Sequence, residues 1–139
     1  MSDWKTPLRL VEQLDKKGNI HEKGVKKLVS AVAEASELGD KLGCAEFIAF
    51  ATSAVRSAPN SEAVLDEVEK QTGVRLQILS GVEEAQLTFL SARRWYGWSA
   101  GRITNLDIGG GSLELSTGTD EHPEMAFSLD LGAGRLTHN

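Results

Sequence analysis

The sequence is poor in the features that mark secreted and membrane proteins. Its 139 residues include a single cysteine, Cys44, so no disulfide can form within the chain. No apolar run approaches the roughly 20 residues of a membrane-spanning helix, and the N-terminus lacks an apolar signal-peptide core. We therefore expect a cytoplasmic protein with no membrane partner, in which Cys44 is a small buried residue.

Positive charge is also in the minority. The chain has 15 basic and 20 acidic residues, which gives a formal net charge of −5. Such a balance disfavours a broad nucleic-acid surface, although a local basic site inside an acidic protein remains compatible with it. An apolar fraction of 40% in a chain of this length suffices for a hydrophobic core. The composition predicts one domain, or one and a fraction, without a nucleic-acid partner.

The order of hydrophobic patterns predicts an α/β protein. A short continuous apolar run at 46–51 is typical of a strand that is covered on both sides in a parallel sheet. Elsewhere apolar residues recur with the period of a helix or alternate as in a half-buried strand. Helices are predicted over 22–42, 61–73 and 80–96, and strands over 4–14, 46–51, 74–79, twice within 102–118, and over 124–131. Helices that alternate with strands are the signature of the α/β class.

The stretch 102–118 contains an acid, three glycines and a second acid. Asp107 ends an apolar run, Gly109 to Gly111 follow, and Glu114 lies in the alternating segment after Ser112. A turn without Cβ atoms can bring its amide groups close to an anion. Asp107 and Glu114 would repel that anion unless a cation lay between them, so a phosphate bound with a divalent metal fits the pattern. A glycine hairpin with two solvated acids fits it equally well.

The helix predicted over 80–96 begins with two neighbouring acids. Ser80 and Glu83 have the spacing of a capping box, in which each side chain bonds to the other residue's amide. Glu84 lies about 100° further round the helix and can face a cleft. The helix dipole favours its ionised form, which a general base requires. Alternatively, both acids occupy the first helical turn without any catalytic role.

Basic residues provide two further candidates. Arg56 follows the strand predicted over 46–51 and could neutralise a phosphate or pair with an exposed acid. The lysines within 23–27 are predicted to form the solvated face of the helix at 22–42, with phosphate binding as the weaker alternative.

Aromatics and glycines interrupt the pattern before the predicted strand pair. Residues 95–101 read Trp-Tyr-Gly-Trp-Ser-Ala-Gly, a composition that breaks helices and indicates a boundary between lobes. We expect these aromatic side chains to pack against the protein, and base stacking is the weaker alternative.

Four motifs together resemble the exopolyphosphatase and guanosine pentaphosphate phosphohydrolase family, in order and in spacing. They are Ala51–Arg56, Leu79–Ala85, Leu106–Glu114 and Leu131–Arg135, and the segment 93–98 looks like the actinobacterial members. The resemblance implies the ribonuclease H-like fold of actin, Hsp70 and the sugar kinases, with an active site between two lobes. By this resemblance residues 1–98 form the first lobe, incomplete at its N-terminus, and 99–139 begin the second, with a boundary uncertain by about ten residues.

The resemblance also implies roles for the candidate residues. Water would attack a terminal phosphate of inorganic polyphosphate, or of guanosine pentaphosphate to give the tetraphosphate, with Mg²⁺ or another divalent cation as cofactor. The implied roles are Glu84 as the base, Arg56 as a catalytic arginine, Asp107 and Glu114 around the metal, and Gly109, Gly110, Gly111 and Ser112 as the phosphate loop.

Two other functional classes remain open. One is a non-catalytic regulatory module that binds polyphosphate or a guanosine alarmone. The other is an ATP-dependent kinase of the same superfamily, which would not be expected to begin a helix with Ser-Gly-x-Glu-Glu-Ala as residues 80–85 do. That motif favours the hydrolase.

The chain departs from the family in one respect. Nothing within 1–10 resembles the Asp-x-Gly-Ser-Asn loop with which members open. We therefore expect a fragment with little or no hydrolytic activity by itself. Core strands that lack neighbours invite pairing between chains, so we also expect a homodimer, which could exchange strands.

Overall fold

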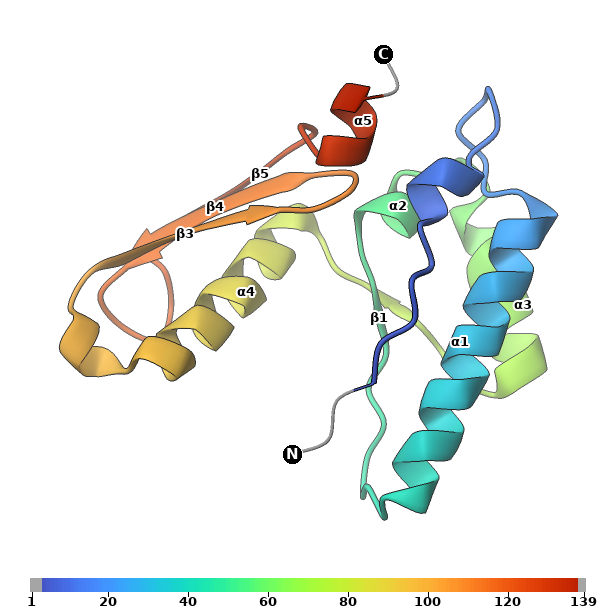
Figure 1. Cartoon of the computed structure of the whole chain (residues 1–139), viewed down its shortest axis with the longest axis horizontal. Helices are drawn as coiled ribbons and strands as arrows, with labels where there is room; N and C mark the ends of the chain where they lie inside the picture. Colours follow the sequence, from blue (N-terminus) through green and yellow to red (C-terminus); the bar gives the residue numbers. More distant parts are fainter. Residues whose placement is uncertain (1–3, 138–139) are drawn as a thin grey trace. The chain divides into compact units, whose positions relative to one another are not determined.

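The computed structural model describes residues 4–137, and the chain divides after Ile78 into two compact units (Figure 1). We call the part before this point unit 1 and the part after it unit 2. The predicted boundary between lobes, near residue 98, lies inside unit 2 and stays a prediction. The expectation that residues 1–10 contain no phosphate loop concerns residues 1–3 as well, and these lie outside the described residues. Within the described range, every helix is too short or too polar to cross a lipid bilayer.

Unit 1 is mostly helical. Its elements are a 3₁₀ helix η1 (Leu10–Gln13), α1 (Glu22–Lys41), β1 (Phe50–Ala51), α2 (Ser53–Arg56), α3 (Ser61–Thr72) and β2 (Gln77–Ile78). The long helices lie where the sequence predicts them, and α3 ends at Gly73, whose φ of 71° only glycine adopts easily. Strands β1 and β2 pair in parallel, as expected, but over two residues each.

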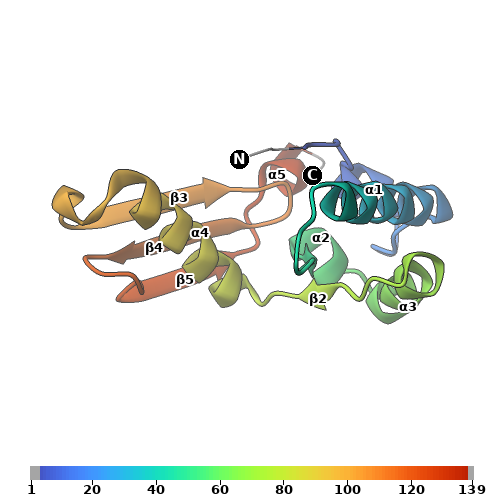
Figure 2. The ribbon, with the colours of Figure 1, turned by 90° about the horizontal axis from the view of Figure 1, so that it is seen from below.

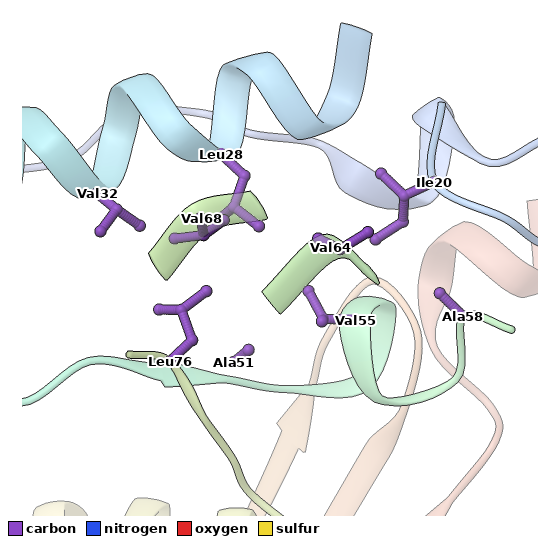
Figure 3. Close-up of a cluster of buried hydrophobic side chains, with 9 residues drawn as sticks. All are labelled: Ile20, Leu28, Val32, Ala51, Val55, Ala58, Val64, Val68 and Leu76. Atoms are coloured by element: carbon purple, nitrogen blue, oxygen red, sulfur yellow. The ribbon is translucent and has the colours of Figure 1, made fainter. Parts of the chain in front are cut away.

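Aliphatic side chains fill the core of unit 1. Leu28 and Val32, one turn apart on α1, lie beside Val64 and Val68 of α3 (Figure 3). Each fully buried side chain of this size contributes about 1.5–3 kcal/mol through removal of apolar surface from water. The nine buried members are Ile20, Leu28, Val32, Ala51, Val55, Ala58, Val64, Val68 and Leu76.

Three expectations for unit 1 are wrong. Residues 4–14 form no strand: Arg9 adopts a left-handed φ of 49°, and η1 follows it. The run 46–51 is strand only at Phe50 and Ala51, and Phe50 is 46% exposed rather than covered on both sides. Cys44 is exposed. Strands need hydrogen-bonding neighbours, and among the described residues of unit 1 β2 alone pairs with this segment.

Unit 2 is a helix packed on an antiparallel sheet. Its elements are α4 (Gly81–Tyr96), η2 (Trp98–Ala100), β3 (Ile103–Ile108), β4 (Leu113–Gly118), β5 (Met125–Leu129) and α5 (Ala133–Thr137). The strand order is β3-β4-β5, and α4 lies along one face of the sheet (Figure 2). The predicted helix, the strand pair and the third strand are confirmed. The expectation that the aromatic side chains of 95–98 pack against the protein is wrong, because Trp95, Tyr96 and Trp98 are exposed.

Candidate functional site

The sheet of unit 2 buries its polar face and exposes its apolar one. The face against α4 carries mostly polar side chains, Asn105, Asp107, Glu114, Ser116 and Ser128, together with Ile103 and Ala126. The opposite face is mostly apolar, with Leu106, Ile108, Phe127 and Leu129 beside Thr104 and Thr117. Glu114 and Ser116 are each 1% exposed, while Leu106 is 57% exposed. Burial of polar groups costs free energy unless they gain partners. A sheet that covers its polar side therefore indicates a site rather than an ordinary core.

Two acids occupy adjacent strands on this polar face. Asp107 of β3 lies directly opposite Glu114 of β4 in the strand register. Ser128 Oγ, from β5, donates to Glu114 Oε1 at 2.8 Å. Residues opposite each other in a sheet have Cβ atoms about 4.5–5.5 Å apart, and like charges so placed destabilise the sheet. A cation between the carboxylates would remove that repulsion.

The acid pair suits a magnesium ion better than a closed metal cage. Among the described residues, no group of three or more His, Cys, Asp or Glu side chains could enclose a metal. Mg²⁺ commonly binds one or two carboxylates and takes its other ligands from water and substrate phosphates. A buried carboxylate at Glu114 with Asp107 beside it on the next strand matches that donor set.

The glycine loop between β3 and β4 is fastened by the start of α5. Gly109 N donates to Ser112 O at 3.0 Å, which closes the turn. The carbonyl of Gly109 accepts from Ala133 N, and that of Gly110 from Gly134 N, each at 2.9 Å. Within residues 4–137, the amides of Gly110 and Gly111 donate to no backbone carbonyl. Anchored carbonyls and available amides are what an anion-binding turn needs.

Close packing against this loop explains the need for glycine at position 132. Gly109, Gly110 and Gly111 are not among the glycines with positive φ. A Cβ on Gly132, however, would overlap the carbonyl carbon of Gly111 and the amide nitrogen of Ser112. The sequence shows Gly132 only as part of a family motif, and its contact with a loop twenty residues earlier is not predictable from spacing.

The first turn of α4 separates the two neighbouring glutamates, as predicted. Ser80 N donates to Glu83 Oε2 at 2.7 Å, and Glu83 N donates to Ser80 Oγ at 3.2 Å. The Ser80 amide and hydroxyl beside this carboxylate hold the pKa of Glu83 below its ordinary value. Glu84 is half-buried and precedes Ala85, which faces the sheet and is fully buried. The capping box is confirmed, while the role of Glu84 as a base stays a prediction.

A buried arginine, which the sequence does not single out, closes the other end of unit 2. Arg93 of α4 is 0% exposed and donates to the carbonyl oxygens of Gly97 (3.2 Å), Gly101 (2.7 Å) and Gly118 (2.9 Å). Its guanidinium carbon lies 5.7 Å from the centre of the Phe89 ring. Arg93 thereby joins the end of α4 to the end of β4 and fixes the helix along the polar face.

The predicted site residues fall into two groups. Glu84, Asp107, Glu114 and the glycine loop all belong to unit 2, where α4 packs on all three strands. Arg56 ends α2 in unit 1, where it is half-buried. Its participation with the other candidates therefore stays a prediction.

The whole chain matches one protein family. The model of the Ppx/GppA phosphatase family matches residues 1–139. Exopolyphosphatase 1 of Mycobacterium leprae is 62% identical over 137 residues, and that of Mycobacterium tuberculosis is 61% identical over the same length. Each match covers 99% of this chain and 40% of the relative. The chain thus spans about two fifths of the length of these curated relatives.

Solved structures give the same likeness. An exopolyphosphatase from Cytophaga hutchinsonii superposes with a TM-score of 0.81 at 27% identity, covering 88% of this chain and 39% of its own. A Ppx/GppA family member from Aquifex aeolicus superposes at 0.78 with 24% identity, covering 94% and 42%, and supports the fold alone. These matches confirm the predicted α/β class and its actin-like fold.

Proposed function

Because the chain belongs to the Ppx/GppA phosphatase family, we propose that it supplies one part of the active site of a phosphohydrolase. The substrate is inorganic polyphosphate, from which the enzyme removes the terminal phosphate, or guanosine pentaphosphate, which it converts to the tetraphosphate. The observation that carries this proposal is the covered polar face of unit 2. This sheet carries an acid pair and a glycine loop with available amides, and it packs against α4, the helix whose first turn contains Glu84.

The chemistry assigned to the chain's own residues is hydrolysis of a phosphoanhydride. Glu84 takes a proton from water, whose oxygen attacks the terminal phosphorus. The bond from that phosphorus to the bridging oxygen breaks, and the shortened polyphosphate leaves with the electron pair. The amides of Gly110 and Gly111 donate to oxygens of the transferring group, where charge must be stabilised. Arg56, if it reaches the same phosphate, adds a positive charge.

The acid pair would hold a divalent cation in this scheme. Asp107 and Glu114 are the residues that would bind Mg²⁺, or another divalent ion, on the polar face. Such an ion, when bound, neutralises charge on substrate phosphate oxygens. Ser112, buried beside the loop, would orient the phosphate through its hydroxyl.

A homodimer is part of the proposal. The outer face of the sheet exposes large apolar side chains, among them Ile108 at 60% and Phe127 at 47%. Contiguous apolar surface of this kind is usually buried on association. Two copies could cover these faces, or exchange strands. Sedimentation at high concentration should show a dimer, and a monomer would contradict this part. We further infer a cytoplasmic protein with no nucleic-acid or membrane partner.

A chimeric enzyme tests the function directly. This chain would replace its matching segment in exopolyphosphatase 1 of M. leprae, and phosphate release would be measured on polyphosphate and on guanosine pentaphosphate, with and without Mg²⁺. We expect release that requires the metal and is lost in the double variant D107N/E114Q. The chain alone should release little phosphate. Release by the chain alone that Glu84→Gln abolishes would show that it is a complete enzyme.

The binding-module alternative gives a different result in the same experiment. A module would bind polyphosphate or the guanosine alarmone tightly, while its chimera would release no phosphate. Comparison of the two substrates then shows which of them the site prefers.

A further inference from the structure

A cluster of lysines that the proposed function does not use lies on helix α1 of unit 1. A pocket of about 360 Å³ opens between the N-terminal segment 6–8 and helix α1. Its α1 wall consists of three lysines, a serine, an alanine and an acid, namely Lys23, Lys26, Lys27, Ser30, Ala31 and Glu34. The lysines therefore line a concave surface, although the sequence alone predicts them as an ordinary solvated face.

Two of these lysines lack a neutralising partner. Lys26 Nζ lies 2.6 Å from Glu22 Oε1, and this pairing raises the pKa of Lys26. Within the described part of the chain, Lys23 and Lys27 form no ion pair. Other lysines do: Lys41 pairs with Glu37 in the last turn of the same helix.

The position of these charges conflicts with the local rules of helix stability. The N-terminus of a helix carries partial positive charge, so a lysine in the first turn, as Lys23 is in α1, is unfavourable. Lys23 and Lys27 are also four residues apart, a spacing at which like charges repel. Glu22 offsets one charge only. Local conflicts that the fold does not compensate tend to lie at functional positions.

We propose that this pocket binds an internal segment of a linear condensed phosphate. The ammonium groups of Lys23 and Lys27 would donate to non-bridging oxygens of the chain, and the Ser30 hydroxyl would add a further donor. The two lysines are separated by about 6 Å along the helix axis, so they can hold successive parts of an extended polyanion. Glu34 lies about 10 Å beyond Lys27 and limits the positive surface.

The proposal rests on the proposed function, since that function makes polyphosphate the ligand. Its consequence is a second contact for long substrates, distinct from the site on the polar face of unit 2. Short phosphates would gain little from this contact, whereas a long chain would bind more tightly.

Binding measurements on the 139-residue chain test the proposal. Affinity for long-chain polyphosphate, tripolyphosphate and orthophosphate would be measured by calorimetry for the wild type and for K23Q/K27Q. The matched control is K41Q/K70Q, which removes the same charge from unit 1 at lysines paired with Glu37 and Glu67. Glutamine is a good helix former, and circular dichroism verifies the fold of both variants.

The expected result is specific to the long ligand. K23Q/K27Q should weaken binding of long-chain polyphosphate roughly tenfold. It should also reduce the slope of log Kd against the logarithm of the salt concentration by about one to two. The control should change affinity less than about twofold, and K23R/K27R should keep most of it.

Several outcomes would overturn the proposal. If K23Q/K27Q and K41Q/K70Q lose equal affinity, general surface charge rather than this pocket binds the polyphosphate. If K23Q/K27Q keeps its affinity, the pocket is not a binding site. Full competition by orthophosphate would indicate a simple anion site. Equal binding of single-stranded DNA, with the same loss, would indicate a nucleic-acid surface. Binding is measured without turnover, so it can be separated from the proposed hydrolase activity. If K23Q/K27Q weakens binding while the chimera is inactive, the result would support this inference and contradict only the proposed hydrolase activity.

Discussion

The two units of this chain bury opposite kinds of side chain. Unit 1 encloses valine, leucine, isoleucine and alanine between α1, α3 and its short strands. In unit 2 the completely buried large side chains include Arg93 and Glu114, and Phe89 is the one large hydrophobic residue that is fully buried there among the described residues. The difference teaches that unit 1 is stabilised by ordinary apolar packing. The face of the unit 2 sheet that α4 covers instead encloses polar side chains such as Glu114 and Ser116.

This arrangement makes unit 2 dependent on individual hydrogen bonds. A buried charge is tolerated only while its partners compensate for the water that it has lost. Apolar packing is more forgiving, because many small contacts share the loss. The comparison predicts that loss of a fully buried charged side chain in unit 2 costs more than loss of an equally buried apolar side chain in unit 1.

Loss of Arg93 should have the largest effect on stability. Arg93→Ala leaves the carbonyls of Gly97, Gly101 and Gly118 without their donor and should lower the free energy of unfolding by about 3–5 kcal/mol. The matched variant in unit 1 is Val68→Ala, at an equally buried site, with an expected loss of about 2 kcal/mol. Urea unfolding measures both, and a smaller loss for Arg93→Ala would reverse the comparison.

A methyl group at Gly132 should disturb the glycine loop. Gly132→Ala pushes the chain against Gly111 and Ser112, and overpacking of this kind costs about 1–3 kcal/mol. The control is Gly39→Ala in α1, where the new Cβ meets Phe47 at an ordinary 3.5 Å and should stabilise the helix by about 0.5–1 kcal/mol. Thermal unfolding should thus shift in opposite directions, and equal shifts would contradict the close packing of the loop.

Removal of the α4 cap should have a moderate effect. Ser80→Ala deletes the acceptor of the Glu83 amide and should cost about 1 kcal/mol. Ser91→Ala, an exposed position on the same helix, should change the stability by less than about 0.5 kcal/mol. If denaturant midpoints of the two variants coincide, the capping box does not stabilise α4.

Acid should weaken the same cap, with the smallest effect. The folded pKa of Glu83 is below its unfolded value of 4.5, so its contribution is complete above that value and is lost as pH falls through the folded pKa. Between about pH 6 and about pH 3 the wild type should lose more thermal stability than Glu83→Gln, which cannot titrate. If the melting temperatures of the two proteins fall equally between these pH values, ionised Glu83 does not stabilise the cap.

Local sequence patterns predicted the parts of the molecule that neighbours in sequence determine. The capping box at Ser80 and Glu83 lies within four residues, and the hairpin around Gly110 within one turn, so both were predictable. Alternation in β4 showed that Glu114 and Ser116 share a face. It did not show which face α4 covers, because that depends on packing between elements.

Long-range contacts account for what the sequence could not show. Arg93 reaches Gly118, 25 residues later, and Gly132 packs on a loop formed twenty residues earlier. Residues 4–14 were predicted as a strand from their alternation, but strand formation requires a partner that this pattern does not provide. Glu84 and Arg56 became candidates through their places at a helix start and after a predicted strand, but these local patterns left their roles open, and the family motifs supplied them.

The central proposal is that the polar face of unit 2 forms part of the active site of a phosphohydrolase. This proposal depends most on Glu84. The decisive measurement is kcat for phosphate release by the M. leprae chimera carrying Glu84→Gln, compared with the chimera carrying Glu83→Gln. Loss of a general base should lower kcat by about 10²- to 10⁴-fold in the first, whereas the second, which changes only the cap, should stay close to the unsubstituted chimera. Equal rates in the two variants, or a greater loss with Glu83→Gln, would contradict the account.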